Sequence, residues 1–97
     1  MSTIEVNSAG HFVVVGAINF VTAMQIYTRG RQLIAASPKP VFDLHNITAT
    51  DNAGVALLTA WTRYAKHLNK AVLFIDLTEQ LLDMVRVGGL QDILPIR

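Results

Sequence analysis

Apolar residues alternate with a period of two near the start of the chain and recur every three or four positions after it. Between Ile4 and Ile18 the pattern predicts two short strands joined by a turn at residues 8–10, because the second run is rich in β-branched residues and Gly10 suits a turn. In the second run, over residues 12–18, the residues at even positions and those at odd positions are both apolar, so neither face of the predicted strand is polar. We therefore expect a β-hairpin whose second strand lies centrally in a sheet and is covered on both faces.

A helical pattern follows the hairpin. Asn19 is a candidate N-cap for a helix over about residues 20–36, since its side-chain oxygen can accept from a first-turn amide. Gly30 lies on the apolar stripe of this helix and costs about 1 kcal/mol of helix propensity relative to alanine. We expect that cost to be tolerable because the glycine lets the helix approach the sheet closely. The prolines at 38 and 40 end the helix.

The remainder alternates strands with helices. Strands are predicted over 41–47 and 71–77, a polar loop over 48–52, and helices over about 53–69 and 79–87. The predicted order is ββαβαβα, and a chain of 97 residues has room for one domain, residues 1–97. We therefore expect an α/β fold with a mixed sheet of about four strands and helices packed on it.

Composition narrows the classes of function. Hydrophobic residues make up 52% of the chain and charged residues 15%, which is typical of a well-packed domain. The net charge of +1 is too small for the electrostatic attraction that nucleic-acid binding needs. The absence of cysteine excludes disulfides, a thiolate nucleophile and cysteine metal sites, and it fits a reducing compartment.

Residues 6–28 carry no charged side chain and are nominally long enough to cross a bilayer. Polar residues interrupt the stretch, and its apolar period changes partway along, as expected for a strand followed by an amphipathic helix. A secretory signal needs a basic start, yet the first basic residue is Arg29. We expect no membrane insertion and a cytoplasmic location.

The usual motifs of nucleotide hydrolases, serine hydrolases and zinc proteases are absent from the sequence. His11, His45 and His67 lack the short spacing of metal ligands. Asp43 and Asp51 could form an acid–base pair, but each has a stronger structural interpretation. Asp43 can bond a loop backbone, and Asp51 can stabilise the following helix by about 0.3–1 kcal/mol. We therefore predict no catalytic residue, no metal and no cofactor, and thus a protein that is not an enzyme.

The second helix carries one broad apolar face, which we assign to the core: Leu57, Leu58, Ala60, Trp61, Tyr64, Ala65 and Leu68. The opposite face carries polar residues, Thr62 among them, but its first turn carries Val55 and Ala56, so an apolar tip is predicted to project toward solvent. Asp51 and Asn52 lie beside that tip. The combination suits a docking surface for another protein, and from the residues alone an ordinary solvated surface is equally open.

Residues 41–58, VFDLHNITATDNAGVALL, resemble the hallmark of the STAS domain family, in which a strand ends in Asp-Leu and an Asp-Ser/Thr-x-Gly-Leu turn leads into a helix. The order of elements and the closing residues 87–96, VGGLQDILPI, are also similar to the family. Within the STAS family, the first resemblance is to the small STAS subunit of bacterial Mla phospholipid-trafficking ABC transporters. The alternative resemblance is to the anti-sigma-factor antagonists, which act in partner-switching cascades.

The Mla resemblance implies a noncatalytic cytoplasmic subunit, held at the inner membrane through the transporter, in a system that maintains outer-membrane lipid asymmetry. Its implied partner is the ABC transporter ATPase, which it binds and stabilises and which hydrolyses ATP. Asp51 and Asn52 are expected to supply polar contacts and Val55 a small apolar anchor, and Thr59 and Arg63 continue that face. The oligomeric state stays open.

Asn52 departs from the family pattern. It stands where anti-sigma-factor antagonists carry the Ser or Thr that is phosphorylated, and where Mla-type relatives usually carry Thr. An amide has no hydroxyl to accept phosphate and cannot acquire a charge near −2. It can still donate and accept hydrogen bonds. We therefore expect a permanent contact at this position instead of a phosphorylation switch.

Overall fold

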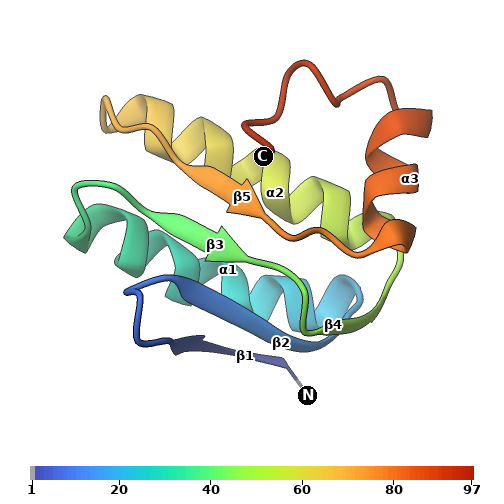
Figure 1. The fold of residues 1–97 in the computed structure, drawn as a ribbon, viewed down its shortest axis with the longest axis horizontal. Coiled ribbons are helices and arrows are strands. Elements are labelled where there is room, and N and C mark those ends of the chain that lie inside the picture. The colour runs from blue at the N-terminus through green and yellow to red at the C-terminus, as the bar shows by residue number, and fades with distance from the viewer. Residues whose placement is uncertain (1) are drawn as a thin grey trace.

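The computed structural model describes residues 2–97, which form one mixed five-stranded sheet and three helices. The strand order is β1-β2-β3-β5, and β4 also pairs with β2 (Figure 1). β1 is antiparallel to β2 and the other pairs are parallel. The α/β fold predicted from the sequence is confirmed. The elements are β1 (Ser2–Val6), β2 (Phe12–Ile18), α1 (Phe20–Ala36), β3 (Val41–Asp43), β4 (Ile47–Thr50), α2 (Asn52–His67), β5 (Leu73–Ile75) and α3 (Glu79–Val87).

The predicted hairpin is present. The Asn7 side chain closes its turn by accepting from the backbone amides of Ala9 at 3.0 Å and His11 at 2.9 Å. Gly10 adopts a positive φ of 79°, a conformation that glycine reaches without steric cost. The turn chemistry therefore sets the register in which Ile4 pairs with Val14.

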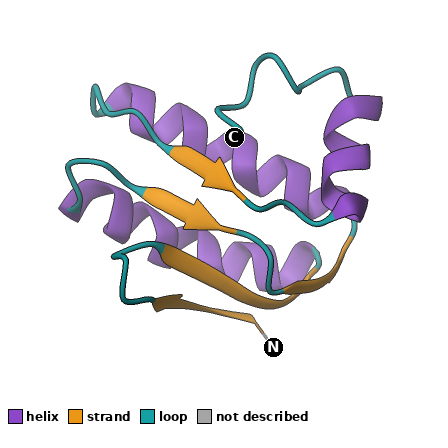
Figure 2. Cartoon of the chain, viewed as in Figure 1, coloured by secondary structure: helices purple, strands orange, loops and turns teal. Residues whose placement is uncertain are grey.

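Within residues 2–97, helices cover one face of the sheet, so the expectation that β2 is covered on both faces holds only in part: on the other face Val13 is buried, whereas Val15 and Ala17 are half-buried. Figures 1 and 2 show α1 and α2 on the same side of the strands. The reason is the order of the strands. The units β2–α1–β3 and β4–α2–β5 each connect parallel strands, and both step across the sheet in the same direction. Because such connections are right-handed, both helices lie on one face. The central position of β2, between β1 and β3, is confirmed.

The predicted strand over 41–47 is broken in two, and the predicted loop over 48–52 is partly strand. Asp43 ends β3 by accepting the backbone amide of His45 at 3.1 Å, which turns the chain. The chain then rejoins β2 as β4, past an irregularity between Gly16 and Ala17. This break produces the fifth strand. β5 is shorter than the predicted strand over 71–77.

The helices begin and end close to the predicted positions. Asn19 caps α1 in a reciprocal capping box with Thr22, as the sequence indicates. α2 begins at Asn52 behind the N-cap Asp51 and ends at His67, two residues before the predicted end. Thr78 caps α3, which ends before Gly88. Within residues 2–97, no helix has the length and apolar character that crossing a membrane requires.

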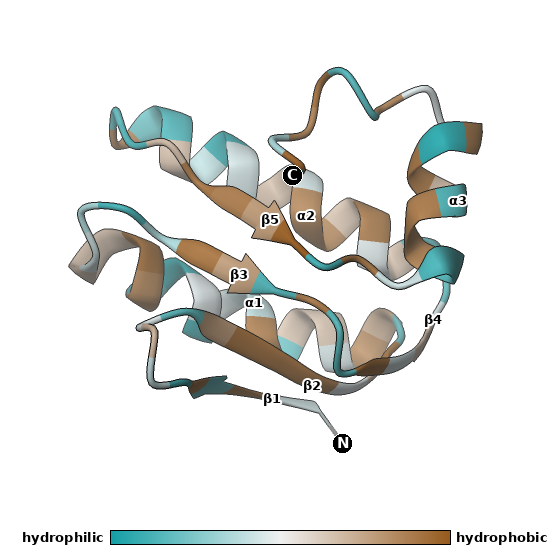
Figure 3. Ribbon diagram, viewed as in Figure 1, coloured by the Kyte–Doolittle hydropathy of each residue, from teal (hydrophilic) through white to brown (hydrophobic). Residues whose placement is uncertain are grey.

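The core lies between the sheet and the two long helices. Trp61 of α2 is fully buried and stacks on Phe42 of β3 with ring centroids 4.4 Å apart. Figure 3 shows that β2 is apolar over most of its length, and its residues Phe12, Val14 and Ile18 join this core. Thr62 was predicted on the solvent face of α2 but is buried. Its hydroxyl donates to the Leu58 carbonyl at 2.8 Å, so burial does not leave this donor unsatisfied.

Candidate partner-binding surface

The start of α2 is held in place by backbone contacts. The Asp51 side chain accepts from the amide of Ala53 at 2.8 Å and so caps the helix. Thr50, buried at the end of β4, donates its hydroxyl to the Asp51 carbonyl at 2.9 Å and its amide to the side chain of Gln80 in α3 at 3.2 Å. These bonds fix the first turn of α2 against α3, and Asn52 is left exposed on that turn.

A groove of about 660 Å³ lies between α2 and α3. The α2 side contributes Asn52, Val55, Ala56, Thr59, Ala60 and Arg63. The other side contributes Asp83, Met84, Val87, Gly88 and Leu90. Four of the five residues expected to bind a partner therefore line one groove, and the exception is Asp51, whose carboxylate caps the helix.

Val55 lies differently from the prediction. It is half-buried and packs against the core, so it is not an apolar tip projecting into solvent. The α3 helix covers part of the first turn of α2, which the isolated helical pattern could not show. Ala56 is exposed, as expected. Thr59 is half-buried, and its hydroxyl donates to the Val55 carbonyl at 2.9 Å.

The most exposed large apolar residue near the groove is Val87, which was not among the predicted contact residues. Val87 is 90% exposed and is the last residue of α3. The buried side of α3 carries Leu81 and Val85 instead. Val87 lies outside the buried side of α3 and directly before Gly88 and Gly89, where the helix ends. This position in the sequence could have predicted an exposed apolar residue.

A second groove of about 200 Å³ lies between α1 and α2. Its α1 wall includes Phe20 and Met24, which are 73% and 65% exposed. Its α2 wall includes Ala56 and Ala60, which also line the first groove. Two apolar grooves thus run along either side of the exposed face of α2.

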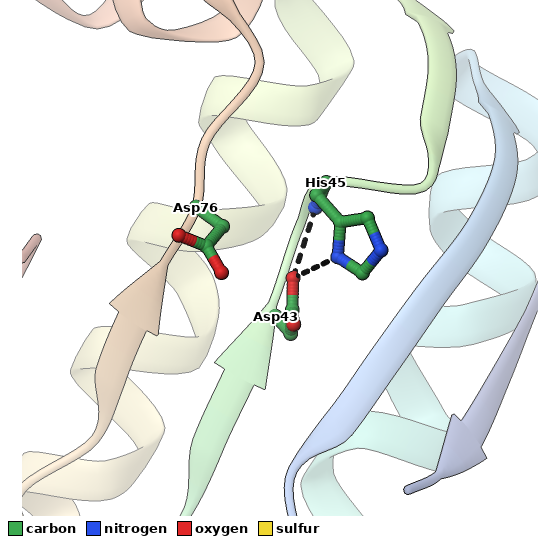
Figure 4. Close-up of side chains that lie close together, drawn as sticks. All are labelled: Asp43, His45 and Asp76. Atoms are coloured by element: carbon green, nitrogen blue, oxygen red, sulfur yellow. Dashed lines mark hydrogen bonds and ion pairs between the residues drawn. The ribbon is translucent and has the colours of Figure 1, made fainter.

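A separate polar cluster lies at the carboxyl ends of β3 and β5. Asp43, His45 and Asp76 each offer a ligand atom within 4.8 Å of the others (Figure 4). The Asp43 side chain is only 9% exposed and already accepts from the His45 amide at 3.1 Å, with Nδ1 of His45 at 2.5 Å. These contacts give Asp43 the structural role that the sequence analysis assigned to it, as a partner of loop backbone. The proximity of His45 to Asp76 was missed, because it depends on the pairing of β3 with β5.

The pKa of Asp43 reflects two opposed effects. Burial raises the pKa of this carboxyl, but hydrogen bonds from the side chain and backbone of His45, together with the charges of His45 and His11, outweigh burial. The pKa of Asp43 therefore lies below its ordinary value of 3.8, and the carboxylate stays ionised. This environment favours a charged structural partner over a proton-exchanging acid.

Comparison with known proteins agrees with this fold. The sequence matches the family model described as "Mlab, STAS domain" over residues 3–95. No curated protein sequence matches the chain. The fold is similar to a putative anti-sigma-factor antagonist from Thermotoga maritima, with a TM-score of 0.74, 11% identity, and coverage of 98% of this chain and 84% of that one.

Two further solved structures share the fold. An anti-sigma-factor antagonist from Mycobacterium paratuberculosis has a TM-score of 0.72 and 20% identity, with coverage of 99% of this chain and 83% of that one. The anti-sigma-factor antagonist SpoIIAA in its unphosphorylated form has a TM-score of 0.67 and 14% identity, with coverage of 91% and 84%. Because the family model spans nearly the whole described chain, the protein belongs to the STAS domain family of the Mlab type.

Proposed function

We propose that this protein is a noncatalytic STAS subunit that binds and stabilises the ATPase of a phospholipid-transporting ABC system. In this proposal ATP hydrolysis belongs to the partner, and contact with the partner holds the protein at the cytoplasmic side of the inner membrane. The Mlab-type family match supports the choice of system. The observation that carries the proposal is the apolar groove along α2, lined by Asn52, Val55, Thr59 and Arg63.

The exposed face of α2 has the character of a binding surface. Val87 borders its larger groove and is 90% exposed, and Phe20 and Met24 border its smaller one. Exposed large apolar side chains that border two neighbouring grooves cost solvation free energy in the free protein and suit contact with another protein. Burial of Val87 on binding would contribute roughly 1.5–3 kcal/mol.

Asn52 supports a constitutive complex. It is exposed at the first position of α2, and within residues 2–97 its side chain makes no hydrogen bond. Its amide is thus available to donate to and accept from a partner. Since it cannot be phosphorylated, the contact is not controlled by charge at this position.

An anti-sigma-factor antagonist is the alternative, and similarity to solved structures of that class favours it. That similarity lies below 25% identity and concerns the fold. The regulatory mechanism of such proteins needs a hydroxyl at position 52, which Asn52 lacks. Thr50 does not replace it, because its hydroxyl is buried and bonded to the Asp51 carbonyl.

The test is calorimetric titration of the chain with the ATPase subunit of a Mla-type transporter and, separately, with an anti-sigma kinase. We expect binding to the ATPase, a raised melting temperature of the ATPase in the complex, and no binding to the kinase. Val87→Glu should weaken binding at least tenfold, which corresponds to about 1.4 kcal/mol. Val6→Glu, at a 58% exposed position on β1, is the matched control and should leave affinity unchanged. Binding to the kinase alone would replace the proposal with its alternative.

A further inference from the structure

We infer that the docking surface is bipartite: the ATPase straddles α2 and fills the grooves on both of its sides at once. This inference rests on the proposed function for the partner's identity as the ATPase. It adds the smaller groove between α1 and α2, which none of the predicted contact residues lines.

Two alanines separate the grooves. Ala56 and Ala60 line both of them, and residues four apart on a helix lie one above the other on the same face. Because an alanine side chain is a single methyl group, the ridge between the grooves is low. A partner can therefore contact both grooves at once without a barrier between them.

The outer rims of the grooves are apolar. Phe20 and Met24 of α1 form one rim, and Val87 of α3 forms the other. The two rims belong to different helices on either side of α2, so a partner that contacts both must cross α2.

The charges of the grooves indicate what the partner carries in each. Among the described residues, the lining of the α1/α2 groove includes no charged side chain, so it suits a wholly apolar part of the partner. The α2/α3 groove is lined by Arg63, which forms no ion pair within residues 2–97. Asp83 on the opposite wall lies 3.8 Å from Arg86. Charge complementarity therefore requires a partner carboxylate next to Arg63 in this groove.

The first test measures the affinity of the full chain for the ATPase with one variant in each groove. Met24→Glu and Val87→Glu should each weaken binding at least tenfold, while Val6→Glu does not. Ala56→Leu should also weaken it, because a larger side chain would raise the ridge between the grooves. Melting temperatures establish that each variant is folded.

If Met24→Glu binds like Val6→Glu while binding by Val87→Glu is weakened, the bipartite surface is overturned and the proposed function stands. If the wild-type chain does not bind, both are overturned.

The second test concerns the carboxylate opposite Arg63. Arg63→Glu should weaken binding more than Arg29→Glu, an equal charge change at an exposed position of α1 outside both grooves. The difference should shrink at high salt, because ions screen an exposed pair. Equal effects of the two variants would overturn the assignment of a partner acid to this groove.

Discussion

The indole of Trp61 fills the space that a side chain at Gly30 would need. A methyl group built on Gly30 would overlap Cε2, Cζ2 and Nε1 of the ring. The same ring nitrogen donates to the Tyr27 carbonyl at 3.1 Å, one turn earlier in α1. Gly30 therefore sets the approach of α1 to α2 and not, as expected from the sequence, its approach to the sheet. The grooves along α2 depend on this spacing.

Gly30→Ala should destabilise the protein although alanine is the better helix former. The gain in propensity is about 1 kcal/mol, and overpacking against a rigid, buried indole costs about 1–3 kcal/mol and displaces α1. We expect a net loss in the free energy of unfolding, measured by urea denaturation. Trp61→Phe replaces the indole with a smaller ring that lacks Nε1 and Cζ2, so the double variant should lose less than the sum of the two single losses. Additive losses would contradict the packing described here.

Lys70 links the end of α2 to the end of α1. Its ammonium group donates to the carbonyls of Ile34 at 2.9 Å and Ala35 at 2.6 Å, at the negative end of α1. The Ile34 carbonyl also accepts from the amide of the C-cap Ser37 at 3.4 Å. Lys70→Met should cost about 1 kcal/mol in the free energy of unfolding. Lys66→Met, an exposed lysine on α2, is the control and should have little effect. Equal effects would mean that the capping contact contributes no stability.

The Asp43–His45 contact predicts a pH dependence of stability. Because the pKa of Asp43 is lowered below 3.8 in the folded protein, its ionised form contributes stability above that pH, and the contribution is lost as pH falls through the folded pKa. Asp43→Asn should lower the free energy of unfolding by about 1–2 kcal/mol at neutral pH. The gap between the two proteins should narrow below about pH 4. A gap that stays constant on acidification would show that the charge of Asp43 is not the cause.

Much of the fold follows from local sequence signals. Asn19 predicted the start of α1 because its cap bonds reach no more than three residues along the chain, and Asp51 and Thr78 cap α2 and α3 in the same local way. The break between β3 and β4 was not predictable in this way, since β4 is defined by pairing with β2, about thirty positions earlier. The half-buried state of Val55 depends on α3 in the same manner.

The candidate surface could also be predicted only in part, for the same reason. Four α2 residues that line the larger groove, Asn52, Val55, Thr59 and Arg63, were predicted as partner contacts from a helical projection and a family resemblance, whereas Ala60 was assigned to the core. The contributions of Met24 and Val87 come from other helices, so only tertiary packing brings them to α2.

Asn52 leads to a prediction about modification. Incubation with an anti-sigma kinase and ATP should leave the wild-type chain unphosphorylated, as judged by intact mass. Asn52→Ser restores a hydroxyl at the family position and serves as the matched comparison. Thr48 is exposed on β4 and is the residue to examine if phosphate does appear. Phosphate on Thr48 or Thr50 of the wild-type chain would contradict a constitutive contact.

The most direct measurement of the docking surface uses the absence of cysteine from the sequence. Ala56→Cys places a single thiol on the ridge shared by both grooves, and Val6→Cys places one on β1, away from them. The rate of alkylation of each thiol is measured with and without the ATPase. We predict that a saturating amount of the ATPase slows alkylation at position 56 at least tenfold and leaves position 6 unchanged. Unchanged alkylation at position 56 in a formed complex would show that the partner binds elsewhere and would contradict the account.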